Sequence, residues 1–464
     1  MPSRGVCCAL SVYFMNVWKY FAALPLLAVS VWAASPAVNE LVLPEEMYPQ
    51  LDSMLKRAVQ QSPRMVDKLI ELEMAENSRI EARAGLLPNL SGSGRFYKAR
   101  DKRADRPGEN LDVDKAFYDV SVTQPIFYWG ERRNNARIGA IQKSITEGNY
   151  REGYRLLAQE IRRTYLQLIV HKIHLERTRI ANKFDQDART LAESRLQAGV
   201  ASEAEIFGAR LTAERSQINL ERTEHELETG LRSLSRLTGV TVTEQDIATE
   251  IPTINYQAQN IEQVLAGFLS QKDPPTPQAE ALRKQMNIDD LAYRNQKTRL
   301  LPKFSFQVGL NQDEQSYTTN SADRYQVDSM YAGLSVNWTI FDGFAASAGK
   351  ANALARRRLN ENQYRALTEQ LAIDAQAHVK SLNFSARSMS ITDRILVSAA
   401  GSYQARKAEF ARGVVSENNV IQDHLSYYEA LISADNARID YLIRLADFLG
   451  LVAEDPVLAN ASTN

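Results

Sequence analysis

Side chains that could carry chemistry are few and scattered along this 464-residue chain. His171 and His174 stand three residues apart, which on a helix puts two imidazoles on one face and could present them to a metal. No third ligand accompanies them in a recognisable motif, so we expect a solvated helix face. The sequence also contains no phosphate-binding loop and no G-x-S-x-G motif. We therefore predict a protein that is not an enzyme and has neither a cofactor nor a metal.

The two cysteines, Cys7 and Cys8, lie in an N-terminal segment typical of export. A short, largely apolar stretch at 21–34 carries small residues suited to cleavage after Ala33 or Ala37, and translation could start at Met1 or at Met15. This stretch is too short to cross a bilayer comfortably. We expect residues 1–33 to be a signal peptide, which leaves a mature chain without a disulfide, a thiol nucleophile or a cysteine metal site.

The charges nearly cancel, with 55 Lys and Arg residues against 56 Asp and Glu residues. This balance gives no reason to expect nucleic acid as a partner. After residue 34 no continuous apolar run approaches the length of a transmembrane helix. If the mature chain spans a membrane, we expect strands to do so, because only helices and closed barrels satisfy their backbone in lipid.

Short motifs recur in the same order along the chain, which indicates an internal duplication. The members of each pair are separated by one constant offset or slightly less, and the pairs are Leu86-Leu87-Pro88 with Leu300-Leu301-Pro302, Val122 with Val336, Gly130 with Gly343, Gly199-Val200 with Gly413-Val414, and Gly239 with Gly450. We divide the mature chain into a first copy, 34–250, and a second copy, 251–464, which ends in a short tail.

Each copy is predicted to contain a helix, two strands, a long helix, a tight turn and another long helix. The expected helices are 51–85 with a restart at Ser62-Pro63, 131–198, 202–237, 344–412 and 416–449. Glycines 139, 148 and 153 weaken the first third of 131–198, so a break is possible there. These elements give an α+β fold that is mainly helical.

The long helix at 131–198 carries two apolar rows with a seven-residue repeat. One row is Ile161, Leu168 and Leu175, and the other is Leu166, Ile173 and Ile180. At ~100° per residue the rows lie roughly 140° apart, so the helix has apolar contacts on two sides. A ring of helices needs two such seams, whereas an ordinary thick bundle remains the alternative.

Four segments alternate between apolar and polar residues as strands do. They are 90–97, 116–123, 303–310 and Met330–Ile340, and the intervening polar segments 99–114 and 311–326 are expected to be loops. A soluble sheet would show the same alternation. Their length of about ten residues and the aromatic residues at their ends favour strands that cross a membrane. Four strands cannot close a barrel, since the smallest have about eight, so several chains must contribute.

The duplicated motifs resemble the outer membrane efflux protein family, the TolC-like outer-membrane factors. The resemblance rests on Ala84–Leu90, on Gln124–Gly130 with Ile340–Gly343, and on the two Gly-Val turns. It implies a homotrimer with a twelve-stranded transmembrane β-barrel in the outer membrane of a Gram-negative-type bacterium and a long periplasmic α-helical barrel. The implied function is passive conduction from periplasm to exterior in tripartite efflux or type I secretion, with an inner-membrane pump and a periplasmic adaptor as partners.

The resemblance implies that the tips of the helical hairpins form the periplasmic entrance and dock the adaptor. Carried over by position, the docking residues are Gly199, Val200, Ser202 and Glu203 in the first copy and Gly413, Val414, Ser416 and Glu417 in the second. The two valines either dock the partner or pack across their own turn.

The resemblance also implies an acidic constriction beside each tip, which this sequence matches only in part. The corresponding residues are Glu205 in the first copy, and Asn419, Gln422 and the neighbouring Asp423 in the second. Because amides replace two of the acids, we expect a polar amide gate. Ser202 and Glu205 also fit a capping box, a structural role that is compatible with pore lining.

Two other protein classes remain as alternatives. One is an exported periplasmic coiled-coil structural or adaptor protein, against which the amphipathic strands argue. Another is a periplasmic hydrolase on a helical scaffold, for which no set of acid, base and nucleophile is found. The cargo stays open among drugs, metals, glycolipids and proteins.

Overall fold

The computed structural model describes residues 41–457 except 103–109, 201 and 318–323, so the predicted signal peptide lies outside the described residues. The elements in chain order are α1 Pro44–Met47, α2 Pro49–Gln61, α3 Pro63–Ala84, β1 Asn89–Lys102, β2 Asn110–Phe127, α4 Glu131–Gln197, α5 Glu203–Thr238, the 3-10 turn Glu244–Asp246, α6 Ala258–Ser270, α7 Pro277–Lys297, β3 Lys303–Tyr317, β4 Arg324–Asn337, α8 Ala345–Ala411 and α9 Glu417–Leu451.

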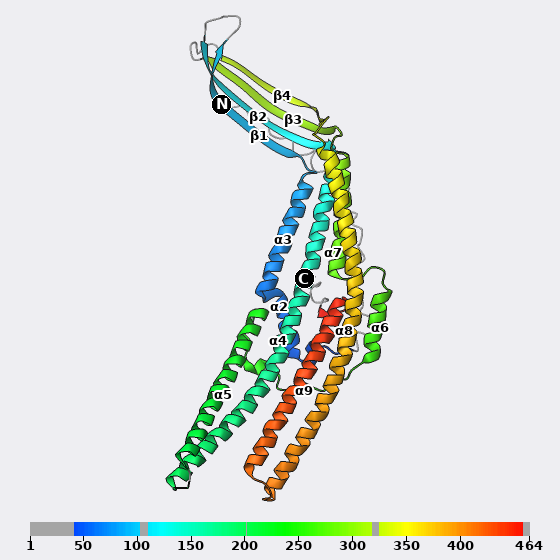
Figure 1. Ribbon diagram of the computed structural model, residues 1–464. Coiled ribbons are helices and arrows are strands. Elements are labelled where there is room, and N and C mark those ends of the chain that lie inside the picture. Colours follow the sequence, from blue (N-terminus) through cyan, green and yellow to red (C-terminus); the bar gives the residue numbers. More distant parts are fainter. Residues whose placement is uncertain (1–40, 103–109, 201, 318–323, 458–464) are drawn as a thin grey trace, which may run out of the picture.

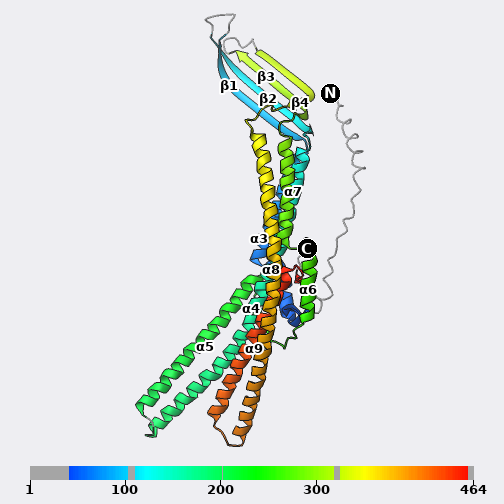
Figure 2. The same ribbon diagram turned by 45° about the vertical axis from the view of Figure 1, so that its right-hand side comes forward.

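The protein is elongated, with the sheet at one end and both helical hairpin tips at the other (Figures 1 and 2). Helices α4 and α8 run from the sheet to the tips and have 67 residues each. At ~1.5 Å per residue, each is roughly 100 Å long. The short helices α2 and α6 lie around the middle of the molecule.

Helix α4 is continuous through the glycines in its first third. A Cβ at Gly139 would lie 2.8 Å from the Cβ of Ala82, and one at Gly153 would lie 3.4 Å from the side chain of Lys68. Both neighbours belong to α3. Glycine at position 139 therefore lets α3 approach α4 closely, whereas a Cβ at Gly153 would make an ordinary van der Waals contact and one at Gly148 would meet nothing within 4 Å. The helix does not break in this stretch, where α3 packs against it.

The predicted restart of the first helix at Ser62-Pro63 is confirmed, because α2 ends at Gln61 and α3 begins at Pro63. The second copy repeats it at the constant offset of the duplication, where Pro277 opens α7 and the Thr276 hydroxyl accepts a hydrogen bond of 3.3 Å from Ala279 N–H. Proline fits the first helical turn, where its missing N–H costs nothing. The duplication thus includes the helix before each strand pair.

The four strands form one antiparallel sheet in the order β1-β2-β3-β4. Leu90 pairs with Val122 in the first copy, and Phe304 pairs with Val336 in the second. Val336 therefore occupies the place of Val122, as the repeat predicts.

The strands extend further than the sequence pattern predicts. The segments 99–114 and 311–326 are expected to be loops, but the residues of them that the structure describes continue the ladders: β1 reaches Lys102, and β3 reaches Tyr317. Their middle parts, 103–109 and 318–323, lie outside the described residues. Polar side chains do not interrupt a ladder that backbone groups form, and here Arg100 and Asp112 pair across it at 2.7 Å. At the other end β4 stops at Asn337, so Trp338 and Ile340 lie beyond the strand instead of inside it.

The sheet has one apolar and one polar face. Met330, Leu334 and Val336 alternate along β4 on the apolar face, and Leu334 is 70% exposed. The opposite face contains Ser121 and Ser305, which are buried, and Tyr331, which is half-buried. Trp338, expected on the apolar strand face, instead donates its indole N–H to the carbonyl of Leu300 at 3.0 Å.

The pair Gly130 and Gly343, which departs from the constant offset by one residue, has a structural explanation. Two successive residues before each long helix have left-handed backbones: Trp129 and Gly130 with φ of 54° and 85°, then Gly343 and Phe344 with φ of 64° and 68°. The left-handed positions of the two copies are therefore separated by the constant offset, although the glycines are not. The glycine occupies the second of these positions in one copy and the first in the other, because either arrangement relieves one residue of the strain.

The core lies at mid-height around α4, and both apolar rows of that helix contribute to it. Five of the six row residues are buried, and Ile180 is half-buried. Helix α4 packs against α5 and also against α9, which confirms contacts on two sides. Among the described helices, none combines the length and apolar character that crossing a membrane requires.

Candidate functional site

The two hairpin tips have the same backbone geometry. Gly199 has φ of 71° and Gly413 has φ of 74°. In the first tip Val200 N–H donates to the Arg195 carbonyl at 2.9 Å and Gly199 N–H donates to the Leu196 carbonyl at 2.8 Å. The second tip repeats both hydrogen bonds, so each long helix ends in a Schellman motif with glycine in the left-handed position.

The helices that leave the tips begin differently in the two copies. Ser202 caps α5 by accepting a hydrogen bond of 3.2 Å from Glu205 N–H, which is one of the two bonds of a capping box. Ser416 has the same extended backbone, but its hydroxyl donates to the side-chain oxygen of Asn419 at 3.3 Å. The amide at position 419 therefore changes the local hydrogen bonding of the second tip.

Both tip valines point away from the protein. Val200 is 77% exposed and Val414 is 70% exposed, so neither packs across its own turn. Glu203 and Glu417, which follow them, are exposed as well. Each tip thus presents an apolar side chain surrounded by polar groups.

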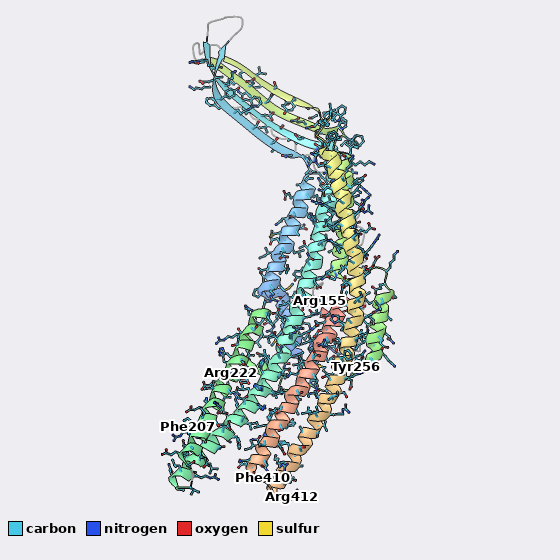
Figure 3. All side chains as sticks on the ribbon, in the orientation of Figure 1. Arg155, Phe207, Arg222, Tyr256, Phe410 and Arg412 are labelled. Atoms are coloured by element: carbon cyan, nitrogen blue, oxygen red, sulfur yellow. The ribbon has the colours of Figure 1, made fainter. Side chains whose placement is uncertain are left out.

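The tips also carry exposed phenylalanines that the sequence analysis did not single out. Phe207 on α5 lies near the first tip, and Phe410 on α8 lies near the second (Figure 3). They enlarge the apolar surface beside Val200 and Val414. A large apolar residue within two turns of an exposed glycine turn is the signal that could have identified them.

The residues proposed for a constriction are not equivalent to one another. Glu205, Asn419 and Gln422 are exposed. Asp423 is half-buried and accepts a hydrogen bond of 3.0 Å from Arg406 Nε on the facing helix α8, a contact that raises the pKa of Arg406. The negative charge of Asp423 is therefore paired inside the hairpin, while the three others are free to face solvent.

Ion pairs across and between the hairpins were not predicted from the sequence. Arg210 pairs with Glu193 at 3.1 Å across the first hairpin, with the same sequence separation of 17 residues as Arg406 and Asp423. The charges are exchanged between the two hairpins: the arginine lies on the second helix of the first hairpin but on the first helix of the second hairpin. Opposite charges within a few helical turns on either side of a tight turn could have suggested both pairs.

A further pair joins the two hairpins to each other. Arg177 on α4 donates to the carboxylate of Glu429 on α9. Nearby, the rings of Tyr403 and His424 stack at 4.4 Å between α8 and α9, and burial lowers the pKa of His424. Only tertiary structure brings these residues together, since they lie far apart in the chain.

Side chains that could bind a metal ion are not grouped in the described residues. No cluster of three or more His, Cys, Asp or Glu side chains suited to a metal ion occurs there. The tips instead offer hydrogen-bond acceptors and apolar contacts, which suit binding of another protein rather than catalysis.

A long two-hairpin helical body that ends in a four-stranded amphipathic sheet is also the fold of solved outer-membrane channels. Residues 54–240 and 280–451 match the family model described as outer membrane efflux protein, so the chain belongs to the outer membrane efflux protein family. This membership replaces the alternatives of a coiled-coil adaptor and a hydrolase. The protein is a non-enzymatic efflux channel of the outer membrane.

Named relatives agree with this assignment. The chain is 23% identical over 412 residues to the pyoverdine export outer membrane protein OpmQ of Pseudomonas aeruginosa. This alignment covers 87% of this chain and 84% of OpmQ. The fold is similar to that of the Campylobacter jejuni CmeC outer membrane channel, with a TM-score of 0.67 at 14% identity over 88% of this chain and 86% of CmeC. It is also similar to VceC from Vibrio cholerae, with a TM-score of 0.64 at 14% identity over 90% of this chain and 99% of VceC.

Proposed function

We propose that this channel works as a trimer whose hairpin tips form the periplasmic entrance and bind a periplasmic adaptor protein. An inner-membrane pump supplies the energy, and the channel conducts cargo passively to the exterior. The observation that carries this proposal is the position of the tips at the end of the molecule opposite the sheet (Figure 1). A turn that far from the membrane is accessible only to periplasmic partners.

Open edges on both sides of the chain support assembly with further copies. In the sheet β1 and β4 are the outer strands. In the helical body α8 is the outer long helix on one side, with α6 packed against it at mid-height, and on the other side α3 lies above and α5 below (Figure 1). Unpaired strand edges are prone to pair with another chain, and repeated head-to-tail contacts can close a ring. Channels of this family form trimers in tripartite efflux systems, and three sheets would supply twelve strands.

An exposed apolar stripe on α8 supports a contact with the next copy. At ~100° per residue its members fall within an arc of roughly 40°. The stripe consists of Leu359, Ile373, Phe384, Ile391 and Ile395, each more than half exposed. On the opposite side of the chain, α3 exposes Ile70 and Met74, and α5 exposes Phe207 and Ile218. Burying such faces against each other is favourable because it removes apolar surface from water.

The charges of the outer helices are complementary. Helix α8 has ten Lys and Arg residues against five Asp and Glu residues. Helix α5 has seven Asp and Glu residues against five Arg residues, and α3 has five acidic against four basic residues. A positive edge that meets a negative edge favours the head-to-tail arrangement over a contact between two like edges.

The exposed tip residues support adaptor docking. Val200 and Val414 each form an apolar knob, and Ser202, Glu203 and Glu417 supply hydrogen-bond acceptors around them. A small apolar centre with a polar rim suits a reversible protein contact. Beside the tips, Glu205, Asn419 and Gln422 would line a polar constriction, with Asp423 contributing less because Arg406 pairs with it.

The docking proposal is tested by changing Val200→Asp together with Val414→Asp in a strain that carries the pump and adaptor. We expect normal trimers in the outer membrane, loss of adaptor crosslinking and loss of export. Pyoverdine is the first cargo to test, because the relative OpmQ is named for its export; any other cargo exported by the unmodified protein serves equally.

The matched control is Val397→Asp on α8. Val397 is 73% exposed, like the tip valines, but it lies outside the tips and on the opposite side of the helix from the apolar stripe. Export should survive this change. Continued adaptor crosslinking and export in the double tip variant would show that the tips are not the docking surface.

A further inference from the structure

On the polar face of the sheet, one tyrosine lies across a neighbouring strand. Tyr331 on β4 is paired in register with Gly309 on β3. Its hydroxyl donates to Asp119 Oδ2 on β2 at 3.1 Å, so the ring reaches across β3 to the strand beyond it. Side chains of a strand normally stand roughly perpendicular to the sheet. Tyr331 instead lies flat on the polar face of the sheet.

Glycine at position 309 is what makes this orientation possible. A Cβ there would lie 2.5 Å from the tyrosine hydroxyl oxygen and 2.6 Å from the ring carbon that bears it. These distances are far below van der Waals contact, and the ring is the group that would have to move. Any side chain at position 309 would therefore lift the ring from the sheet.

Two hydrogen bonds at its hydroxyl hold the ring in place. Asp119 is itself oriented by Ser121, whose hydroxyl donates to Asp119 Oδ1 at 3.3 Å. The side-chain amide of Gln307 lies 3.5 Å from the tyrosine hydroxyl and donates to it. Tyr331 is thus anchored to β2 and β3 as well as to its own strand.

The equivalent position in the first copy is built differently. Arg95 and Phe117 precede Gly309 and Tyr331 by the constant offset of the duplication, and they form the corresponding cross-strand pair. The Arg95 guanidinium lies over the Phe117 ring at 5.3 Å. The first copy therefore keeps a bulky stacked pair where the second copy keeps a flattened ring.

We infer that Gly309 and Asp119 set the width of the channel at this level by holding the Tyr331 ring flat against its wall. This inference depends on the proposed function, in which the polar face of the sheet lines the lumen. Gly309 and Asp119 act as positioning residues, and Tyr331 is the group that would obstruct passage if released. Three copies would place three such rings around one lumen.

The test uses a cysteine reporter on the inner side of the tyrosine. The described residues contain no cysteine, and Ser335 is an exposed residue of the same face that lies nearer the helices than Tyr331. In cells carrying Ser335→Cys, membrane-impermeant maleimides of increasing size are added from outside. Because they must pass the Tyr331 level, we expect added Gly309→Ala to abolish labelling by large reagents while small ones still react.

Four further variants separate the flattened ring from a general change in the sheet. Gly333→Ala adds the same methyl group on the same face, where nothing lies within 4 Å, and should leave labelling unchanged. Gly309→Ala combined with Tyr331→Ala should restore labelling by large reagents. Asp119→Asn keeps an acceptor oxygen for the Tyr331 hydroxyl, so labelling of Ser335→Cys should not change. Asp119→Ala removes the acceptor and should abolish labelling by large reagents.

The outcomes distinguish failure of this inference from failure of the proposed function. If small reagents label Ser335→Cys and Gly309→Ala leaves large reagents equally reactive, the role of Tyr331 is wrong and the lumen assignment stands. If small reagents fail at Ser335→Cys, the polar face does not line the lumen and both proposals fall.

Discussion

Gln124 and Trp338 make the same hydrogen bond in the two halves of the chain. The Gln124 amide donates to the Leu86 carbonyl at 3.1 Å, and the Trp338 indole donates to the Leu300 carbonyl at 3.0 Å. The two donors are separated by the same offset as the two acceptors. Two side chains of different shape thus connect the end of a strand to the first leucine of the Leu-Leu-Pro motif. The two copies therefore share this contact although the residue that makes it differs.

Alanine at the tip glycines should destabilise the turns. Gly199 and Gly413 have left-handed backbones, where a Cβ costs roughly 1–2 kcal/mol per residue. No other atom lies within 4 Å of either added Cβ, so backbone strain is the only penalty. We expect Gly199→Ala to speed hydrogen exchange of the neighbouring amides. Gly208→Ala, inside α5 and equally unobstructed, should instead stabilise its helix by about 0.5–1 kcal/mol. Equal exchange in both variants would contradict this assignment.

A charge on the apolar sheet face should impair assembly. Leu334→Arg places a guanidinium where the proposed channel meets lipid, at a cost of roughly 2–4 kcal/mol near the middle of a membrane. Ser335→Arg, one residue along on the polar face, is the control and should assemble normally. The measurement is the yield of heat-modifiable trimer in outer membranes. Normal trimer yield from Leu334→Arg would argue against contact between this face and lipid.

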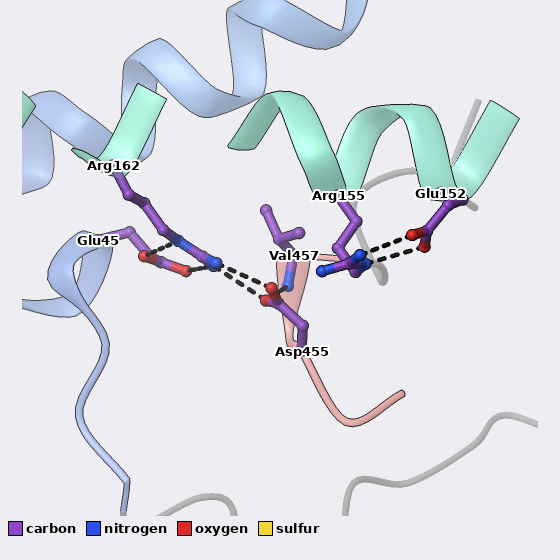
Figure 4. Close-up of polar contacts among 6 residues, drawn as sticks. All are labelled: Glu45, Glu152, Arg155, Arg162, Asp455 and Val457. Atoms are coloured by element: carbon purple, nitrogen blue, oxygen red, sulfur yellow. Dashed lines mark hydrogen bonds and ion pairs between the residues drawn. The ribbon is translucent and has the colours of Figure 1, made fainter. Parts of the chain in front are cut away.

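Removing the buried Arg162 should destabilise the protein strongly. Its guanidinium bonds to Glu45 near the start of the described chain and to Asp455 near its end, the latter at 2.8 Å (Figure 4). Arg162→Met would leave the buried carboxylate of Asp455 and the partly buried one of Glu45 without a cation, a loss of about 3–5 kcal/mol. Thermal unfolding measures it.

An exposed ion pair provides the control for that change. Arg232 pairs with Glu228 one helical turn away, and both side chains are more than half exposed. Arg232→Met should cost no more than about 0.5 kcal/mol, because exposed helix pairs contribute little. Similar melting temperatures for the two variants would mean that the ion pairs of Arg162 do not hold the first and last described segments to α4.

Asp435 should make stability depend on pH in the direction opposite to that of most carboxylates. Burial raises its pKa to about 6, an effect that the 2.9 Å hydrogen bond from Arg438 only partly offsets. The folded protein therefore retains a proton that the unfolded chain releases near its ordinary value of 3.8. The contribution of Asp435 is largest at low pH and is lost as the pH rises through 3.8 to about 6.

Asp435→Asn removes this dependence. The difference in unfolding free energy between the variant and the unmodified protein should change by on the order of 1–3 kcal/mol between pH 4 and pH 7, in favour of the variant at pH 7. Denaturant unfolding at several pH values measures it. A difference that is constant with pH would show that Asp435 is ionised throughout.

The sequence by itself determined the repeat, the element order and the family. Recurring motifs such as Leu86-Leu87-Pro88 locate the ends of elements, and their local causes act over a few residues: proline starts a helix, glycine ends one, and apolar rows mark buried faces. These causes do not depend on distant contacts. The Gly199 and Gly413 turns were located for the same reason.

Tertiary structure alone decided the strand ends, the continuity of α4 and the polar contacts between distant segments. A ladder continues through polar residues when a partner strand is present, as at Arg100 and Asp112, and pattern along one strand does not record that partner. Gly139 weakens an isolated helix, yet in the fold it admits α3. Tyr331 lies flat because Gly309 and Asp119, which belong to different copies of the repeat, are adjacent only after the two copies pair.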